Sequence, residues 1–315
     1  MIKSITVTNY LGDILKLDLM RPERSGFIVK SITGLGPGKA NINTSEVSTT
    51  DGGLFNSSRL PVRNIVLSLE FMEMFEHIDG WAQSIEEARL KSYRFFPIKR
   101  QVTLVIETDK RTVEISGYIE SNDPAIFSKN EGSEISIICP DPYFYSVNDV
   151  VSTEFYGVEP LLEFEFSNES TTDPLIEMGS ISMTTEQTIE YEGDIEIGVT
   201  ITIHATGEAN DIAIIHNHGN TSGSIRIDTT KLKNVMKTDY TIKEGDEIVI
   251  STMKGNKNVK LKRDGNEYLI LNCLDKNVDW FQLARGKNTF TYTADGDGIY
   301  NINVSIESRV RYEGV

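Results

Sequence analysis

The stretch Arg-Asn-Ile-Val-Leu-Ser-Leu-Glu-Phe, residues 63–71, indicates most clearly which fold class the chain adopts. Ile65, Leu67, Leu69 and Phe71 occupy every second position, and most of the residues between them are polar. In an extended strand this period of two places apolar side chains on one face and polar side chains on the other. The stretch therefore predicts a β-strand with one face in a hydrophobic core.

The same alternation recurs along the whole chain and predicts a mainly β protein. In the second half, turn-forming residues separate the segments at short intervals, a pattern typical of a β-sandwich or jelly roll. Asp264-Gly265 predicts a two-residue hairpin, because a type I′ turn needs positive φ at both central positions. The further strands are expected within residues 102–106, 113–119, 135–139, 162–166, 199–203, 248–250, 290–292 and 300–306.

One segment follows a helical pattern instead. Ser84-Ile85-Glu86-Glu87 has the spacing of a capping box, in which a serine at the N-cap is followed three residues later by a glutamate. Residues 88–93 are mainly good helix formers, and Pro97 follows. We expect one short helix here, ending before Pro97.

The chain is long enough for two domains. Its 315 residues are about twice the length of a typical single domain. Pro140 and Pro142 prevent the strand expected at 135–139 from continuing as a paired central strand. We place the boundary near residues 146–156 and expect an N-terminal β-rich domain with one short helix over 1–150 and a β-sandwich over 151–315.

The charge balance excludes some classes of partner. The 31 Lys and Arg residues against 47 Asp and Glu residues give a net charge of −16, which disfavours binding to nucleic acid or anionic membranes. No apolar run approaches the roughly 20 residues that span a bilayer. The N-terminal residues alternate like a strand and lack the apolar core of a signal peptide. We expect synthesis in the cytoplasm, no sequence-specific nucleic-acid partner and no membrane insertion.

Cysteine usage and the missing catalytic motifs argue against an enzyme. Cys139 and Cys273 are the only cysteines, so no disulfide framework and no four-thiolate zinc site is expected. No Gly-x-Ser-x-Gly motif occurs, and neither cysteine has a histidine near it in sequence. We expect no catalytic residue, no cofactor and no bound metal.

Two motifs that suggest ligand sites fail on spacing. The glycine-rich segment 34–39 resembles a phosphate-binding loop, but Thr33 and Ala40 stand where the motif needs Gly and Ser or Thr. Residues 295–298 resemble the start of a calcium loop, but Ile306 stands at its twelfth position instead of Glu. We expect a flexible or hairpin-forming loop in the first case and a hairpin turn in the second.

His216 and His218 have the spacing that would place both rings on one side of a strand. A metal site would need a third ligand, and the other histidines do not supply one nearby, because His204 is the closest and His77 lies in the other half of the chain. Gly219-Asn220 follows directly, so we expect a turn at this segment.

Charge is distributed unevenly. Residues 1–150 carry 16 basic and 20 acidic residues, whereas residues 151–315 carry 15 and 27, and no Lys or Arg occurs between Lys129 and Arg226. The basic residues of the first domain gather on and just after the expected helix. They are either solvated surface or one of two complementary faces of neighbouring subunits. The candidate interface residues are Arg94, Lys99, Arg100, Lys110 and Arg111.

An ordered set of segments resembles the distal tail protein (Dit) family of long-tailed phages. In the first half these are residues 51–59, 63–67, 88–97, 117–120 and 139–144. In the second half, residues 280–283, 286–288 and 310–315 are similar to the C-terminal part of the same siphovirus-type tail component. The resemblance covers nearly the whole length.

The resemblance implies a structural protein. Family members have an N-terminal β-rich domain that assembles into a ring, typically a hexamer, and a C-terminal galectin-like β-sandwich. The ring lies in the tail tip, or baseplate, between the tail tube protein and the tail-tip or tail-associated lysin protein, and carries other parts such as receptor-binding proteins. An oligomeric ring repeats one heterologous interface, which gives the uneven charge a role. Tails of contractile type and phage-tail-like bacteriocins use related proteins.

An alternative function is a carbohydrate- or receptor-binding tail module that acts through the C-terminal sandwich. Trp280 and Phe281 could stack on sugar rings there, although aromatic residues more commonly pack in a core.

Overall fold

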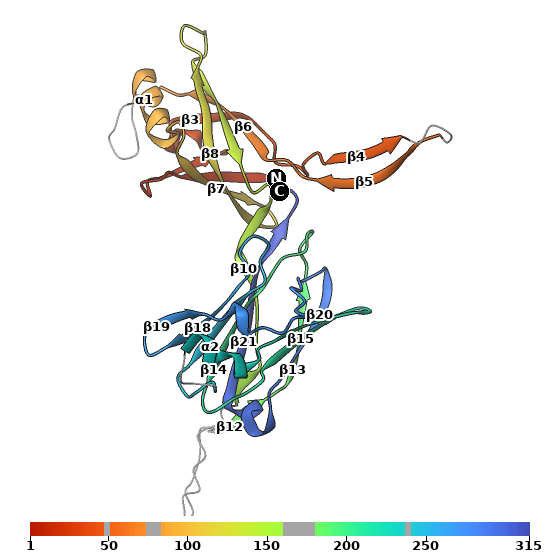
Figure 1. Ribbon diagram of the computed structural model, residues 1–315. Helices are drawn as coiled ribbons and strands as arrows, with labels where there is room; N and C mark the ends of the chain where they lie inside the picture. The colour runs from red at the N-terminus through yellow and green to blue at the C-terminus, as the bar shows by residue number, and fades with distance from the viewer. Residues whose placement is uncertain (47–50, 74–82, 160–179, 237–240) are drawn as a thin grey trace, which may run out of the picture. The chain divides into compact units, whose positions relative to one another are not determined.

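The computed structural model describes residues 1–46, 51–73, 83–159, 180–236 and 241–315. The chain forms two compact units, the first of Met1–Asp149 with Arg311–Val315 and the second of Val150–Val310 (Figure 1). Strands dominate both, and the predicted mainly β, sandwich-like fold class is confirmed. Among the described residues, no helix is long and apolar enough to span a membrane.

The first unit is a twisted sheet with the strand order β2-β1-β7-β8-β9-β6-β3. The start of β10 pairs with β8 through Tyr145 and Ser146. Neighbouring strands are antiparallel. The elements are β1 (Ile2–Thr8), β2 (Ile14–Asp18), η1 (Pro22–Arg24), β3 (Phe27–Thr33), β4 (Asn41–Glu46), β5 (Gly53–Arg59), β6 (Arg63–Phe71), α1 (Ile85–Phe95), β7 (Gln101–Thr108), β8 (Thr112–Pro124), β9 (Gly132–Cys139) and β10 (Phe144–Glu154).

Strand β8 changes partner along its length. Its first part pairs with β7 and its second part with β9, with an irregularity between Ile119 and Ser121. Gly117 lies just before this change, where a Cβ atom would stand 2.8 Å from Cys139 Sγ and 2.9 Å from the Ile138 carbonyl oxygen. Only glycine fits this close approach of two strands.

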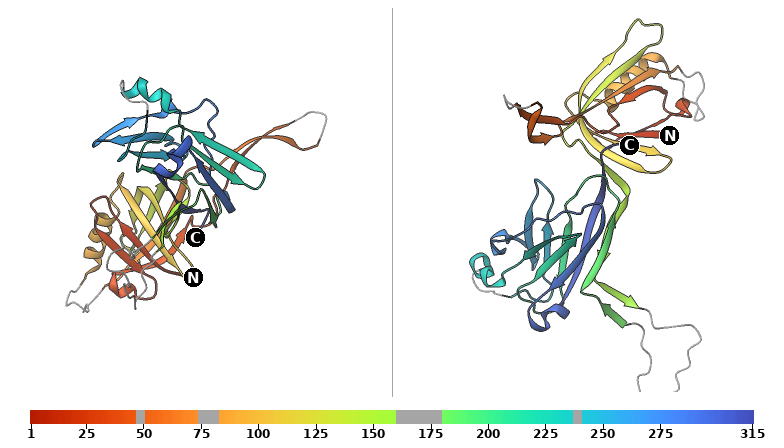
Figure 2. Two further views of the ribbon diagram at one scale, coloured as in Figure 1. Left: turned by 90° about the horizontal axis from the view of Figure 1, so that it is seen from below. Right: turned by 90° about the vertical axis from the view of Figure 1, so that its right-hand side faces the viewer.

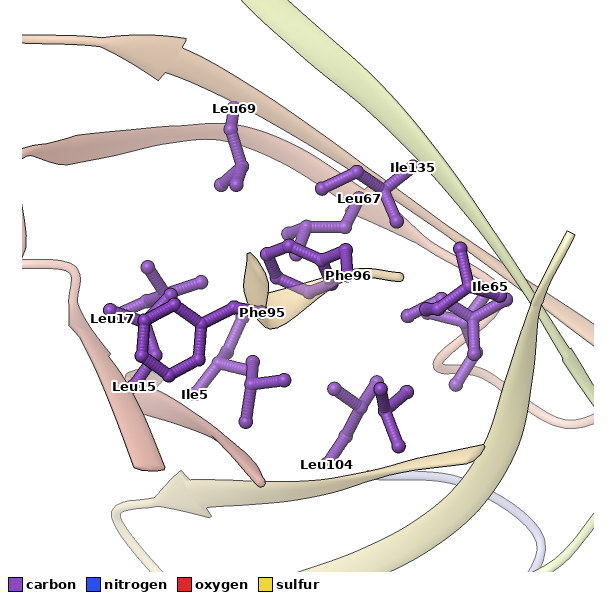
Figure 3. Packing of buried hydrophobic residues seen from close by; sticks show 14 of the residues in the cluster. Ile5, Leu15, Leu17, Ile65, Leu67, Leu69, Phe95, Phe96, Leu104 and Ile135 are labelled. Atoms are coloured by element: carbon purple, nitrogen blue, oxygen red, sulfur yellow. The ribbon is translucent and has the colours of Figure 1, made fainter. Parts of the chain in front are cut away.

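The core of the first unit contains the apolar residues that the alternation predicted. Ile65, Leu67, Leu69 and Phe71 on β6 are all buried. Figure 3 shows the side chains of β1, β2, β6, β7 and β9 converging on Phe95 and Phe96. Because each such side chain stabilises the fold by about 1.5–3 kcal/mol when fully buried, this cluster holds the helix against the sheet.

Helix α1 begins and ends as the sequence predicts. Ser84 Oγ accepts from the Glu87 amide at 3.2 Å, and Glu87 Oε2 accepts from the Ser84 amide at 2.8 Å, so the capping box is complete. These two bonds satisfy amide groups that have no partner inside the helix. The helix ends at Phe95, two residues before Pro97.

The second unit has two principal sheets. One runs in the order β10-β21-β14-β17-β18-β19 and the other in the order β13-β20-β15-β16, while β11 and β12 form a separate pair. The elements are β11 (Tyr156–Glu159), β12 (Ser180–Met183), β13 (Glu186–Tyr191), β14 (Thr200–Ala205), β15 (Ala213–His218), β16 (Thr221–Arg226), η2 (Thr229–Leu232), α2 (Lys233–Met236), β17 (Glu247–Ser251), β18 (Asn258–Arg263), β19 (Asn266–Leu269), η3 (Leu271–Cys273), β20 (Gly286–Thr293), η4 (Gly296–Asn301) and β21 (Ile302–Tyr312).

The predicted hairpin of the second unit is confirmed. β18 pairs with β19, and Arg263 faces Asn266 across the turn. Asp264 and Gly265 have φ of 50° and 75°, the positive values that a type I′ turn requires.

Three sequence predictions in this half need correction or fall outside the description. Residues 295–298 do not form a hairpin turn, because β20 pairs with β13 and β15 while β21 pairs with β14 and β10. His216 and His218 lie in strand β15, not in a turn, and the turn begins at Gly219. The strand expected at 162–166 lies outside the described residues.

The last five residues belong to the first unit, although the expected division assigned 151–315 to the second domain. The Val315 amide donates to the Leu35 carbonyl at 3.1 Å. Arg311 stacks on Tyr143, with its guanidinium carbon 3.7 Å from the ring centre. These contacts hold the C-terminal residues against the first unit, which also contains the N-terminus.

Candidate assembly surface

Strands β4 and β5 pair into an antiparallel hairpin that extends away from the sheet of the first unit (Figure 1). We call its described residues, 41–46 and 51–59, the arm. Every one of these side chains is exposed, including the apolar Ile42 at 63%, Leu54 at 62% and Phe55 at 66%. The arm therefore adds nothing to the core of its own chain.

Such a hairpin is an unusual element for an isolated chain. A two-stranded hairpin with no packed face is marginally stable in water. Both of its outer edges also present unpaired backbone groups, which favour pairing with another strand. Exposed apolar side chains and open edges are features that surfaces for other proteins share.

Arg63 fixes the base of the arm. Its side chain is only 6% exposed and donates four hydrogen bonds of 2.6 Å to backbone carbonyls. Two of these acceptors precede the arm, whereas Arg63 itself follows it, so one side chain joins both ends of the hairpin. The acceptors are the carbonyl oxygens of Gly34, Gly36, Pro142 and Glu313.

The guanidinium of Arg63 is also held by a ring. Its central carbon lies 4.7 Å from the centre of the Phe144 ring. Burial lowers the pKa of Arg63 from its ordinary value, since leaving water disfavours the charged form. The four carbonyl dipoles and the ring face compensate for part of that cost.

The glycine-rich segment 34–39 forms part of the base of the arm. Gly34 has φ of +81°, and a Cβ atom there would stand 2.1 Å from the Asn64 carbonyl oxygen. The segment thus turns tightly enough to offer the carbonyls of Gly34 and Gly36 to Arg63.

The structure divides the five predicted interface residues between two places. Arg94 donates two hydrogen bonds to Asp13 Oδ2, at 3.1 and 2.9 Å, and lowers the pKa of that carboxyl. Arg100 stacks on Tyr10 at 5.0 Å, and Lys99 adopts a positive φ of 64° in the same connection. Arg94, Lys99 and Arg100 therefore lie near the turn between β1 and β2.

Lys110 and Arg111 lie at the opposite end of β7. They form the turn between β7 and β8, where Arg111 stacks on Tyr312 at 4.4 Å. The eight residues of β7 separate the two groups by roughly 25 Å. The five residues do not form one patch, and their role in an interface stays a prediction.

The two histidines of the second unit bond within that unit, and only His216 is buried. His216 Nε2 lies 3.0 Å from Asn288 Oδ1, and its ring packs 5.0 Å from Phe281 and 4.7 Å from Phe290. His218 Nδ1 lies 2.9 Å from the Lys287 carbonyl oxygen. Within the described residues, no group of three His, Cys, Asp or Glu side chains could hold a metal ion.

The two aromatic residues considered for sugar binding differ in how deeply they are buried. Phe281 is only 9% exposed and packs edge-on against Phe290, with ring centres 5.8 Å apart. Trp280 is partly exposed, and Lys257 Nζ lies 5.5 Å from its ring centre. One partly exposed ring covered by a lysine does not make an open stacking platform.

Both cysteines are buried and unpaired. Burial raises the pKa of Cys139 to about 11, and it also raises the pKa of Cys273. Because the thiolate is the reactive form, both side chains are inert parts of the core at neutral pH.

The second unit matches a known family of phage proteins. Residues 192–307 match the family model of the siphovirus-type tail component, C-terminal domain. This match lies entirely within the second unit and covers less than half of the chain. No curated protein matches the sequence of the chain.

The fold of the whole chain is similar to that of the SPP1 Dit protein (gp 19.1). The two chains agree with a TM-score of 0.61 at 14% identity over 98% of each. That protein is described as a paradigm of the hub adsorption apparatus in phages that infect Gram-positive bacteria. Together with the family model, this fold confirms the expected resemblance to the distal tail protein family.

Two baseplate structures of phage p2 show weaker similarity. A chain of the activated baseplate with strontium has a TM-score of 0.44 at 12% identity over 97% of each chain. The activated baseplate with calcium gives the same score and identity over 98% of each chain.

Sequence reasoning overlooked the two features that matter most at this surface. Residues 41–46 and 53–59 lack a regular apolar period, which indicates only that they contribute no core face. Arg63 looks like an ordinary charged residue at the start of a strand. Its burial depends on carbonyls that come from distant parts of the chain.

Proposed function

We propose that the protein is a structural hub of a phage tail tip and assembles into a ring through its first unit. The expected ring is a hexamer that joins the tail tube protein to the tail-tip or tail-associated lysin protein. It also carries other baseplate parts, among them receptor-binding proteins. Within this proposal the protein is not an enzyme, needs no cofactor, and is made in the host cytoplasm before it joins the virion tail.

The observation that carries the proposal is the arm. All of the described side chains of this hairpin are exposed, so it buries no side chain within its own chain. It can bury its apolar side chains only when another chain covers it. The similarity to a hub protein supports a second copy as that chain, because a hub repeats one contact around a closed circle.

The mass of the full-length protein in solution tests the proposal. We expect a closed multiple of 35.3 kDa, six copies for a hexamer, by light scattering or native mass spectrometry. Replacing Ile42, Leu54 and Phe55 by serine should yield monomers with an unchanged melting temperature, since these side chains are outside the core.

A matched control replaces exposed apolar residues of the second unit. Leu269 and Tyr300 are 60% and 64% exposed, and their serine variants should retain the ring. A ring that survives the arm substitutions would assign assembly to another surface.

A further inference from the structure

We propose that residues 311–315, which we call the return segment, act as a switch for assembly. They occupy a peptide-binding site on the first unit, and only the occupied site holds the base of the arm in the position that allows assembly. The inference rests on the proposed ring and concerns when it can form. The return segment lies on the first unit although it follows the second unit in the chain. Figure 2 shows the C-terminus on the first unit, where the N-terminus also lies.

The backbone of the return segment bonds to the site at two points. The Val315 amide donates to the Leu35 carbonyl at 3.1 Å, and the Glu313 carbonyl accepts from Arg63 Nη2 at 2.6 Å. Gly314 lies between these bonds and is buried, and a Cβ atom there would stand 3.0 Å from the Leu35 carbonyl oxygen. A side chain at position 314 would therefore push the segment before the arm outward.

Side chains of the return segment also pack on the first unit. Tyr312 and Val315 lie against the hydrophobic core of that unit. The centre of the Tyr312 ring lies 4.4 Å from the guanidinium carbon of Arg111. The site thus contacts an aromatic ring, an apolar side chain and a glycine, which makes it selective for this sequence.

Arg311 adds a stacked and paired cation. Its guanidinium carbon lies 3.7 Å from the centre of the Tyr143 ring, and its Nη2 lies 3.6 Å from Asp141 Oδ1. A guanidinium is attracted by the negative face of an aromatic ring. The side chain of Arg311 is only 15% exposed, so salt screens these contacts less than contacts at the open surface.

The site controls the segment that enters the arm. The carbonyls of Gly34 and Gly36 accept from Arg63, while the Leu35 carbonyl between them accepts from Val315. Three successive carbonyls ahead of the arm are therefore held from two sides. Without the return segment, Leu35 loses this donor and Arg63, only 6% exposed, loses one of its four acceptors. The base of the arm then loosens, because a buried polar group left without a partner costs free energy.

The order of synthesis makes this contact a late event. The second unit, Val150–Val310, lies between the two parts of the first unit in the chain. A ribosome adds about 5–20 residues per second, so the first unit lacks its return segment for roughly 10–30 s. Small β-rich domains fold within milliseconds to seconds. The second unit therefore has time to fold before the first unit is complete, and copies with an unfinished second unit stay out of the ring.

Removing the return segment from the otherwise intact chain tests the switch. A chain that stops at Val310 should be monomeric by light scattering. Trypsin should cut it faster after the exposed Lys39, because proteolysis reports how often the backbone opens. The cut after the exposed Lys254 should keep its rate, which shows that the second unit is intact.

The return segment can then be added back as a peptide. The N-acetylated peptide Arg-Tyr-Glu-Gly-Val should slow the cut after Lys39 and restore the ring. It is used at millimolar concentration, the effective concentration that a short covalent link supplies. The same peptide with Gly314→Val should do neither.

A substitution in the full chain gives a second test. Gly314→Ala places a methyl group against the Leu35 carbonyl and should weaken ring association about fivefold, the effect of one lost hydrogen bond. Gly38→Ala is the matched control, because its Cβ atom would stand 3.5 Å from the nearest side chain, and it should leave the ring unchanged. Both variants keep the full chain, so they decide the question even if the shortened chain aggregates.

The outcomes separate the two proposals. A shortened chain that still forms the ring, or equal association of Gly314→Ala and Gly38→Ala, overturns the switch and leaves the proposed function in place. A monomeric wild type overturns the proposed function. Equal rates of cutting after Lys39 with and without the return segment overturn the peptide-binding site.

Discussion

Arg63 links three distant stretches of the first unit through a single side chain. Its four acceptors come from the segment before the arm, from Pro142 and from the last residues of the chain. Replacing it by methionine keeps the volume of the side chain but leaves buried carbonyls without donors. Each such group costs about 1–3 kcal/mol, although partial hydration of the opened site reduces the sum.

We therefore expect Arg63→Met to lower the free energy of unfolding by about 3 kcal/mol or more, measured by chemical denaturation. Arg59→Met is the matched control, because Arg59 lies on the exposed face of the arm and should change stability by less than about 0.5 kcal/mol. Equal losses in the two variants would show that Arg63 does not anchor the base of the arm.

His216 provides a pH-dependent prediction at the same scale. Asn288 Nδ2 donates to the Ala284 and Gly286 carbonyls, which orients Oδ1 toward the imidazole. His216 Nε2 therefore carries the proton and donates to that oxygen. Burial is the main cause that lowers the pKa of His216 from its usual value, and His218 adds to the effect.

Because the folded protein resists protonation of His216, its contribution to stability is complete above the pKa of the unfolded chain, about 6.5. It is lost as the pH falls below that value toward the lowered pKa of the folded state. We expect the melting temperature to fall between pH 7.5 and 5, and to fall less in His216→Gln, whose amide can still donate to Asn288. Parallel pH curves for the two proteins would contradict the assignment.

Helix α1 is the element whose local sequence alone determines its start. Ser84→Ala removes the hydroxyl that accepts from the Glu87 amide and should destabilise the protein by about 1 kcal/mol. Ser128→Ala is a control at an exposed loop serine and should have a smaller effect. Thermal unfolding of both variants gives the comparison, and a loss no larger at Ser84 than at Ser128 would show that the cap is not needed.

Local pattern predicts elements but not their partners. The alternation at 63–71, the capping box at Ser84 and the Asp264-Gly265 turn each depend on a few neighbouring residues, and all three are present in the structure. The connection at 295–298 failed because alternation shows which face of a strand is buried, not which strand lies beside it. β20 and β21 are consecutive along the chain, yet each pairs with strands other than its neighbour.

The same limit explains what the sequence could not show of the candidate surface. A row of basic residues from Arg94 to Arg111 reads as one cluster, but an intervening extended strand places its ends far apart. Conversely, Lys16 and Lys91 are distant in sequence and line one surface hollow between β2 and α1. Only the pairing of strands, which depends on the whole chain, brings such residues together or separates them.

At the scale of the whole molecule, assembly should depend on salt. The chain has a net charge of −16, so copies repel one another unless local basic surface meets acidic surface. The screening length falls from about 10 Å at 0.1 M to about 3 Å at 1 M ionic strength, which weakens attraction between exposed charges. Contacts of apolar arm residues do not weaken in this way.

We expect light scattering to show weaker ring association at 1 M than at 0.1 M salt. Each exposed ion pair contributes only about 0–1 kcal/mol, so a single substitution should have little effect, whereas the double reversal Arg100→Glu/Arg111→Glu should slow or block assembly at low salt. The reversal addresses both ends of β7, because Arg100 and Arg111 lie at opposite ends of that strand. Single reversals then show which end of β7 meets a neighbour. Assembly that ignores both salt and charge reversal would mean that these basic residues are solvated surface and that the ring is held by apolar and main-chain contacts alone.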